Sequence, residues 1–267
     1  MGKKWLAGIG GVAILTMAGI ALSISLLSEQ TEDAAWERLQ ETGVLRIGLD
    51  ASYPPFEYVD SHNQIVGLDV DLATELGRRL GAEIIFVNMA YDGLFDALLT
   101  GQVDILISAL VATREYAGKA HFSVPYFNAG EYLVVLDGSS IGAMSDLAGH
   151  TLAVEYGSGG DVEARRWERR LANLQVERYP DPGAALSAVI EGEADAALVD
   201  GITARLGVGQ HPELRLGENV AETLIAAAVH PDSMTLSAQV DEILAGMIRD
   251  GTVDALIEKW FGPQQNG

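Results

Sequence analysis

Hydrophobic and polar positions follow two rhythms along this chain, and together they predict strands that alternate with helices. Val44 to Leu49 is a short apolar run that ends at Asp50, and Glu83 to Val87 is a second. Between them, apolar residues recur every three to four positions from 70 to 80, and Gly81 follows the last. Such alternation is typical of parallel βαβ units, so the pattern predicts an α/β fold.

One unit of this pattern occurs twice. Residues 97–108 contain a helix end, a glycine, a turn and an apolar strand, and residues 188–199 repeat that design with their Gly and Asp in register. Thr151 to Gly157 also resembles the strand and loop at 46–50. The repeat predicts two similar α/β lobes. The alternative is a chance similarity between two units of one sheet.

Other segments extend the predicted order. Pro54 and Pro55 predict an extended loop after the first strand, because proline disfavours helix there. The remaining expected elements are a helix over 34–41, a hairpin over 57–67, strands over 131–136 and 224–229, a helix over 162–171 and two helices over 236–261 that break at 250–251.

The first thirty residues form a separate segment. Lys3 and Lys4 precede residues 5–27, a stretch of 23 residues without a charged side chain, and Glu29 follows it. This arrangement directs the rest of the chain out of the cytoplasm. A cleavable signal has an apolar core of about 7–15 residues, whereas about 20 span a bilayer. Residues 1–30 are therefore expected to be a membrane anchor, with a cleaved signal peptide as the alternative.

Composition excludes several classes of protein. The chain has 267 residues, of which 38 are acidic and 17 basic, and its net charge of −21 would repel a nucleic-acid partner. The absence of cysteine excludes disulfides, thiolate metal sites and thiol nucleophiles. A hydrophobic content of 48% excludes a disordered chain.

Loops at the carboxyl ends of the predicted parallel strands are the candidate binding places, because ligands of α/β sheets bind there. The glycine-rich turn at 157–160 precedes a helix, so it either offers free N–H groups to an anion or is only a tight turn. Asp200 ends an apolar strand, where its carboxylate either meets a cationic ligand or caps a helix.

An ordered series of motifs runs from Gly43 to Gly262. It includes Arg46-Ile47-Gly48-Leu49-Asp50, Tyr53-Pro54-Pro55-Phe56-Glu57, Gly67-Leu68-Asp69-Val70-Asp71, Tyr91-Asp92-Gly93-Leu94, Phe122-Ser123-Val124-Pro125-Tyr126-Phe127 and Lys259-Trp260-Phe261-Gly262. This series resembles the polar amino-acid-binding proteins of ABC importers, the extracytoplasmic solute-binding proteins of family 3. The resemblance implies a two-lobed, type II periplasmic-binding-protein-like fold with two βαβ lobes, two crossing strands and a ligand cleft between the lobes. Residues 43–130 plus 224–262 would form lobe 1, and residues 131–223 would form lobe 2.

The resemblance also implies a set of ligand-binding positions. In that family two aromatic side chains enclose the ligand's side chain, a glycine turn donates to its carboxylate, and an aspartate receives its α-ammonium. The matching positions here are Asp50, Tyr53, Tyr91, Ser108, Thr113, Tyr116, Gly157, Ser158, Gly159 and Asp200.

Two positions depart from the family's pattern. Tyr116 stands where an arginine normally binds the α-carboxylate through two parallel hydrogen bonds, and Val111 stands where Ser or Thr is common. A phenol offers only one neutral donor. We therefore expect modest affinity for ordinary amino acids, or a preference for ligands whose carboxylate is absent or masked. Arg114 is the alternative carboxylate-binding residue, although a solvated surface position is the simpler interpretation.

The function implied is that of a non-enzymatic receptor, located in the periplasm or at the cell surface. It would capture an amino acid or a related small amine and deliver it to an ABC permease, as a monomer without cofactor, metal or catalytic residue. One alternative is an enzyme like the cyclohexadienyl dehydratases, which resemble this family; it would need a proton donor such as Glu155, Asp161 or Glu163. Another is a sensing domain for a separate signalling partner, because the chain ends at Gly267 without an output module.

Overall fold

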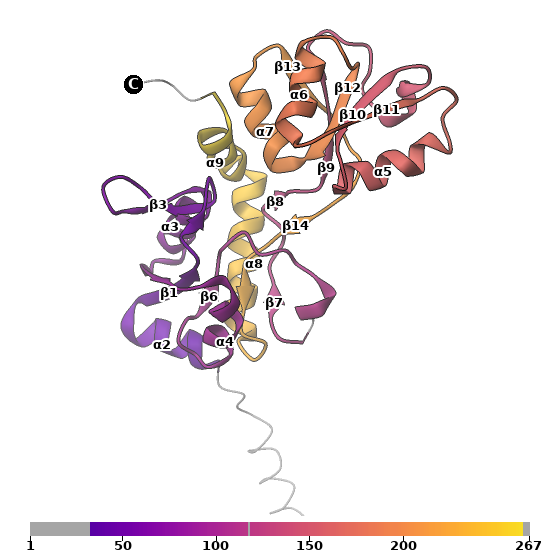
Figure 1. Ribbon diagram of the computed structural model, residues 1–267. Helices are drawn as coiled ribbons and strands as arrows, with labels where there is room; N and C mark the ends of the chain where they lie inside the picture. The colour runs from indigo at the N-terminus through magenta and orange to yellow at the C-terminus, as the bar shows by residue number, and fades with distance from the viewer. Residues whose placement is uncertain (1–32, 117, 264–267) are drawn as a thin grey trace, which may run out of the picture.

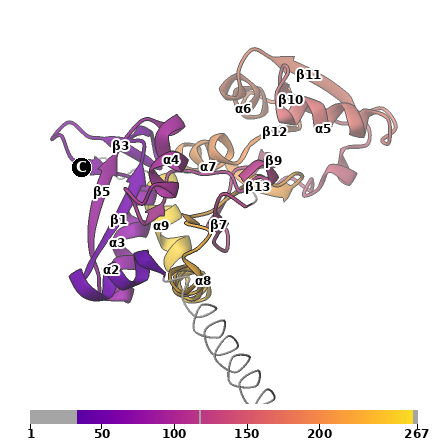
Figure 2. The same cartoon turned by 90° about the horizontal axis from the view of Figure 1, so that it is seen from below.

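The computed structural model describes residues 33–116 and 118–263, which form two α/β lobes joined by two crossing segments (Figures 1 and 2). The expected anchor at residues 1–30 lies outside the described residues. Among the helices that are described, none is both long and apolar enough to cross a membrane.

Lobe 1 is built on a five-stranded sheet of order β5-β1-β6-β15-β7. Strand β1 is parallel to β5 and β6, as the alternating pattern predicts, whereas β15 is antiparallel to both of its neighbours. The strands are β1 (Val44–Leu49), β5 (Glu83–Asn88), β6 (Ile105–Leu106), β7 (His121–Phe122) and β15 (Ala228–Val229). A small sheet of β2 (Ser52–Tyr53), β3 (Glu57–Val59) and β4 (Ile65–Val66) projects from it.

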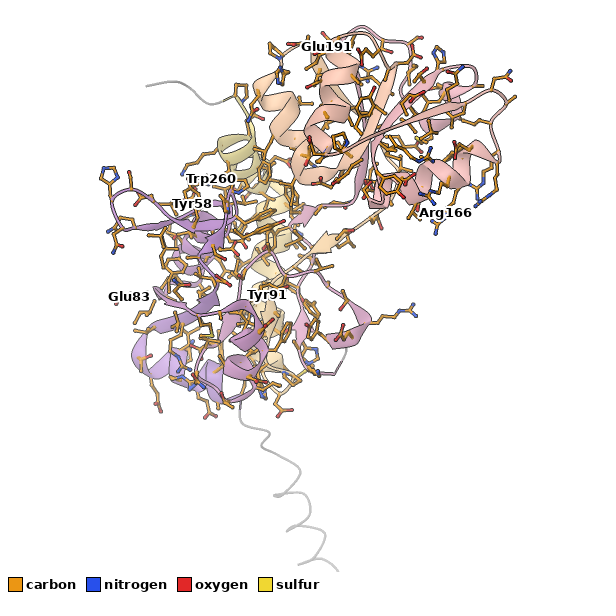
Figure 3. The ribbon with its side chains drawn as sticks, in the orientation of Figure 1. Tyr58, Glu83, Tyr91, Arg166, Glu191 and Trp260 are labelled. Atoms are coloured by element: carbon orange, nitrogen blue, oxygen red, sulfur yellow. The ribbon has the colours of Figure 1, made fainter. Side chains whose placement is uncertain are left out.

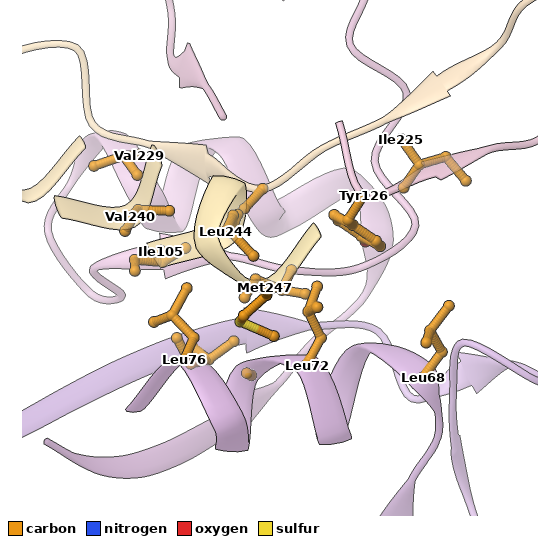
Figure 4. Packing of buried hydrophobic residues seen from close by; sticks show 14 of the residues in the cluster. Leu68, Leu72, Leu76, Ile105, Tyr126, Ile225, Val229, Val240, Leu244 and Met247 are labelled. Atoms are coloured by element: carbon orange, nitrogen blue, oxygen red, sulfur yellow. The ribbon is translucent and has the colours of Figure 1, made fainter. Parts of the chain in front are cut away.

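The helices of lobe 1 come from both ends of the chain. They are α2 (Ala34–Thr42), α3 (Leu68–Leu80), α4 (Leu94–Leu99), α8 (Met234–Arg249) and α9 (Thr252–Phe261), with the 3-10 turns η1 (Tyr91–Gly93) and η2 (Arg114–Tyr116). Helices α3 and α8 bury their apolar faces against each other, and Leu72, Leu76, Leu244 and Met247 meet there with no exposed surface (Figure 4). Lobe 1 therefore has a core that the C-terminal helices help to close.

Lobe 2 has a sheet of the same design, with the order β11-β10-β12-β9-β13. Strand β10 is parallel to β11 and β12, and β9 is antiparallel to β12 and β13. The strands are β9 (Glu131–Leu136), β10 (Thr151–Glu155), β11 (Gln175–Tyr179), β12 (Ala196–Asp200) and β13 (Leu214–Asn219). The helices are α5 (Gly159–Glu168), α6 (Pro182–Ile190) and α7 (Gly201–Gln210), with the turn η3 (Met144–Leu147). Apolar clusters cover both faces of this sheet.

The sequence repeat has a structural cause. The Asp104 carboxylate accepts the backbone N–H of Arg46 at 2.9 Å, and the Asp195 carboxylate accepts the backbone N–H of Thr151 at 2.8 Å. Each aspartate thereby fixes the start of the central parallel strand of its own lobe. The repeated Gly and Asp thus belong to a turn that occurs once in each lobe and holds the beginning of this strand in place.

The two lobes are connected by β8 (Phe127–Asn128) and β14 (Leu224–Ile225). These strands pair as an antiparallel ribbon between the lobes, called here the hinge ribbon (Figure 1). The ribbon continues toward lobe 2 through the N–H of Glu131, which donates to the carbonyl of Ala221 at 2.9 Å. Backbones approach so closely at Gly130 that a Cβ there would overlap the Ala221 carbonyl.

Two predicted elements differ from the structure. The apolar run at 224–229 forms two strands in two different sheets, because the chain passes from the hinge ribbon into lobe 1 between Ile225 and Ala228. The helix predicted over 162–171 spans Gly159–Glu168 instead, because the Ser158 hydroxyl accepts the N–H of Asp161 and so caps it three residues earlier.

Candidate functional site

A pocket of about 350 Å³ lies on the side of lobe 1 where β1 and β6 end. Four of the predicted ligand-binding residues line it, together with three that sequence reasoning did not select. The lining residues are Asp50, Ser52, Tyr53, Glu57, Tyr91, Ser108 and Ala109. The structure therefore brings together segments that lie far apart in the sequence.

Two tyrosines form exposed walls of this pocket. Tyr53 is 48% exposed and stacks on Phe56 with ring centroids 5.8 Å apart, and Tyr91 is 45% exposed. Figure 3 shows Tyr91 on the part of lobe 1 that is turned toward lobe 2. Because both rings line one pocket, they offer apolar faces to a ligand.

Asp50 and Ser108 have hydrogen bonds that fix the pocket's shape. The N–H of Asp50 donates to the Ser108 hydroxyl oxygen at 3.0 Å, and the N–H of Tyr91 donates to the Asp50 carboxylate at 2.8 Å. The Ser108 hydroxyl in turn donates to Glu57 at 2.8 Å. Ser108 therefore has no proton left to donate, and Asp50 holds Tyr91 in place while its second oxygen stays available.

Beneath the pocket lies a pair of buried carboxyl groups that sequence reasoning missed. Glu57 is 1% exposed and Asp69 is fully buried. Asp69 accepts the N–H of Ala109 at 2.6 Å, which stabilises Ala109 at a positive φ of 43°. Burial, and the negative charge of Asp69, raise the pKa of Glu57, and burial raises the pKa of Asp69. The pair thus keeps a proton at neutral pH.

Lobe 2 presents Asp200 at the end of β12. Its carboxylate accepts the N–H groups of Ile202 and Thr203, both at 3.0 Å, and the Thr203 hydroxyl at 2.7 Å, so it caps α7. Burial, followed by the negative charges of Asp200 and Glu57, raises the pKa of Tyr53. Asp200 in lobe 2 therefore lies near Tyr53 in lobe 1, on the other side of the gap between the lobes.

The glycine-rich turn at 157–160 already uses several of its donors. Gly157 donates to the Asp161 carboxylate at 3.1 Å, and Asp161 donates to the Ser158 hydroxyl at 3.1 Å. Asp161 is buried and also binds Arg165 and Arg178, at 2.6 and 2.8 Å. The Arg165 guanidinium holds the pKa of Asp161 well below its usual range. This carboxylate stays ionised and serves the structure of lobe 2.

Glu131 is a second residue that the sequence did not reveal. It begins β9, and its half-buried side chain crosses to the glycine turn, where a Cβ at Gly159 would overlap its Oε1. Burial, and the negative charges of Asp200, Glu163 and Glu155, raise the pKa of Glu131 to about 7. Its Oε2 is buried without a hydrogen-bond partner among the described residues.

Tyr116 and Thr113 lie beside the pocket and are not among its lining residues. The Tyr116 ring stacks on Phe95 at a centroid distance of 3.9 Å, and Lys119 lies 5.6 Å from its centroid. The charge of Tyr116 is one cause of the raised pKa of Tyr91, after burial, so the two phenols are neighbours. Thr113 and Arg114 are exposed. Tyr116, which the resemblance matched to a carboxylate-binding arginine, thus packs as an aromatic side chain.

Comparisons with known proteins agree with this architecture. The family described as bacterial extracellular solute-binding proteins, family 3, matches residues 45–263. The chain is 27% identical over 263 residues to the L-cystine-binding protein TcyJ of Escherichia coli (strain K12), covering 96% of this chain and 97% of that protein. It is 28% identical over 255 residues to the cyclohexadienyl dehydratase of Pseudomonas aeruginosa, covering 93% and 87%.

Among solved structures, the L-cystine solute receptor of Neisseria gonorrhoeae in the unliganded open conformation superposes with a TM-score of 0.75 at 22% identity. The match covers 85% of this chain and 96% of that one. This likeness confirms the predicted two-lobed α/β fold.

Proposed function

Because the chain belongs to the bacterial extracellular solute-binding proteins of family 3, we propose that it captures an amino acid or a related small amine and delivers it to an ABC permease. The observation that carries this proposal is the pocket walled by Tyr53 and Tyr91, with Asp50 at its edge and Asp200 near Tyr53 on the facing lobe. Aromatic walls suit a ligand's apolar part, and Asp200 suits its ammonium group. A ligand bound by both lobes favours the closed form that a permease recognises.

A thermal-shift screen of the part of the chain after residue 32 tests this function. We expect stabilisation by some member of a panel of amino acids and amines, and none by organic acids that lack an amine. The gain follows RT ln(1 + [L]/Kd) and reaches about 2.7 kcal/mol at a hundredfold excess over Kd. A panel in which organic acids stabilise the protein and amines do not would contradict the proposal.

The relative with dehydratase activity makes catalysis the second candidate. Dehydration needs a proton donor in the cleft. Asp161 does not suit that role, because Arg165 and Arg178 keep it ionised, and Glu163 is paired with Arg166. Two of the three expected donors are thus engaged within lobe 2, and we propose a receptor without catalytic activity. Mass spectrometry of a stabilising ligand after prolonged incubation should recover it unchanged, whereas loss of water would support the enzyme.

We further propose that residues 1–30 remain attached and anchor the protein to the membrane, with the lobes outside the cytoplasm. The uncharged stretch at 5–27 exceeds the apolar core of a cleavable signal, and a chain without cysteine has no thiol for a lipid anchor. The protein would then meet its permease by diffusion in the membrane plane.

A further inference from the structure

Acidic side chains gather on lobe 2 where strands β12 and β9 lie side by side. Asp200 and Glu131 are directly opposite on the neighbouring antiparallel strands β12 and β9. Residues in such positions have Cβ atoms about 4.5–5.5 Å apart, and like charges there destabilise a sheet. Glu155, at the end of β10, and Glu163, on α5, add to this field, because both help to raise the pKa of Glu131.

Three arginines of lobe 2 are already paired with carboxylates. Arg165 and Arg178 bind Asp161, and Arg166 binds Glu163. The described residues also include no cluster of three or more His, Asp or Glu suited to a metal ion. An organic cation would supply the charge that balances Glu131 and Asp200.

Glu131 also occupies the place where a ligand carboxylate would sit. Its side chain lies against the glycine turn at the N-terminus of α5, with Oε2 3.2 Å from the Cβ position of Gly160. The N–H groups of Gly157 and Asp161 already have acceptors within lobe 2. A ligand carboxylate at this turn would lie against the Glu131 carboxyl group.

The pocket of lobe 1 supplies no positive group either. It is lined by Asp50 and by Glu57, which is 1% exposed and keeps a proton together with the buried Asp69. Tyr116 replaces the family's arginine at its side. The residues that line this pocket therefore include no group that would neutralise an α-carboxylate, and Asp50 among them attracts cations.

We propose that Glu131 and Asp200 form a paired subsite for cationic groups, and that the ligand class is a dicationic amine without an α-carboxylate. The inference rests on the proposed receptor function and narrows its ligand. The hydrocarbon part of such a ligand lies between Tyr53 and Tyr91, and one ammonium group contacts Asp200 while the second is next to Glu131. A dication removes the repulsion between the two carboxylates.

The test compares 1,5-diaminopentane with L-lysine by titration calorimetry, because the two compounds differ only in the carboxylate. We expect the diamine to bind at least tenfold more tightly. Glu131→Gln should weaken diamine binding at least tenfold, whereas Glu177→Gln, which removes the same charge from an exposed position on β11 of the same lobe, should not. Lysine binding as tightly as the diamine, or equal effects of the two variants, would overturn the proposal.

Proton release on diamine binding distinguishes a ligand contact by Glu131 from a purely structural role of this residue. A cation beside Glu131 lowers the pKa of its carboxyl group, so diamine binding near pH 7 releases protons and strengthens as the pH rises from 6 to 8. A carboxylate there would cause proton uptake instead, and this sign would contradict the proposal. We expect Glu131→Gln to abolish the release and to keep the unliganded melting temperature, which shows that it folds.

Failure of the receptor function and failure of the dicationic ligand class give different results. If neither amines nor amino acids bind, the receptor function itself is wrong. If amino acids bind and the diamine does not, the receptor function stands and only the dicationic ligand class is excluded.

Discussion

Asp200 caps helix α7 and is also proposed to bind the ammonium group of the ligand, so an experiment has to separate the two roles. Asparagine is as good a helix cap as aspartate, and its amide oxygen can accept the same N–H groups of Ile202 and Thr203. We expect Asp200→Asn to weaken amine binding by about 2–5 kcal/mol, because the buried ammonium group of the ligand loses its carboxylate partner.

The melting temperature of the unliganded Asp200→Asn variant should remain close to that of the parent. Asp181→Asn is the matched control, because Asp181 caps α6 in the same way through Ala184. Calorimetry and thermal unfolding of both variants decide the matter. An Asp200→Asn variant that binds as tightly as Asp181→Asn would remove Asp200 from the site.

We expect Asp161 to make the stability of lobe 2 sensitive to acid, and we assign it no catalytic role. Its pKa is lowered by Arg165 and Arg178, so its contribution to stability is present above the unfolded-state value of about 3.9 and is lost as the pH falls. We expect Asp161→Asn to reduce the free energy of unfolding by about 1.5–3 kcal/mol at pH 7 and by less at pH 3. Urea titrations at both pH values measure the free energy of unfolding. An equal reduction at pH 7 and pH 3 would contradict an ionised Asp161 in the folded protein.

Among the elements, the hinge ribbon has the tightest backbone approach, at Gly130. Gly130→Ala forces the new methyl group into the Ala221 carbonyl and should cost about 1–3 kcal/mol, as overpacking does. Gly93→Ala is the control, because nothing lies within 4 Å of its Cβ position and its φ of −89° is ordinary. Urea unfolding should separate the two variants, and equal stabilities would show that the ribbon can open without strain.

Sequence patterns predicted those elements whose signals are local. Helix α3 ends at Gly81 as its periodicity indicates, and the repeat around Asp104 and Asp195 predicted two lobes of one design. The division of 224–229 into β14 and β15 was not predicted, because its residues are uniformly apolar and the sheet that each half joins depends on distant partners.

The candidate site shows the same limit. Tyr53 and Tyr91 were identified because ordered motifs contain them. Glu131 carries no local signal, since it is simply the first residue of a predicted strand, and its importance arises from Asp200 on the neighbouring strand and the turn at 157–160. The roles of the predicted residues in binding a ligand stay predictions until variants are measured.

At the scale of the whole molecule, the N-terminal segment predicts attachment to the membrane. We expect the full-length protein to keep its N-terminus and to sediment with membranes after a high-salt wash, because residues 5–27 contain no charge over a length that spans a bilayer. N-terminal sequencing and fractionation provide the measurement. A soluble mature protein that begins near Ile24 or Leu26 would establish the cleaved signal instead.

The order of strands along the chain has a consequence for biogenesis. Every strand of the lobe 2 sheet comes from one continuous stretch, 131–219, whereas lobe 1 receives β15, α8 and α9 only afterwards. Domains generally fold as units and in order of emergence, N-terminal first. We therefore expect that a chain exported from its N-terminus completes lobe 2 while lobe 1 still exposes the apolar face of α3, which α8 covers only later.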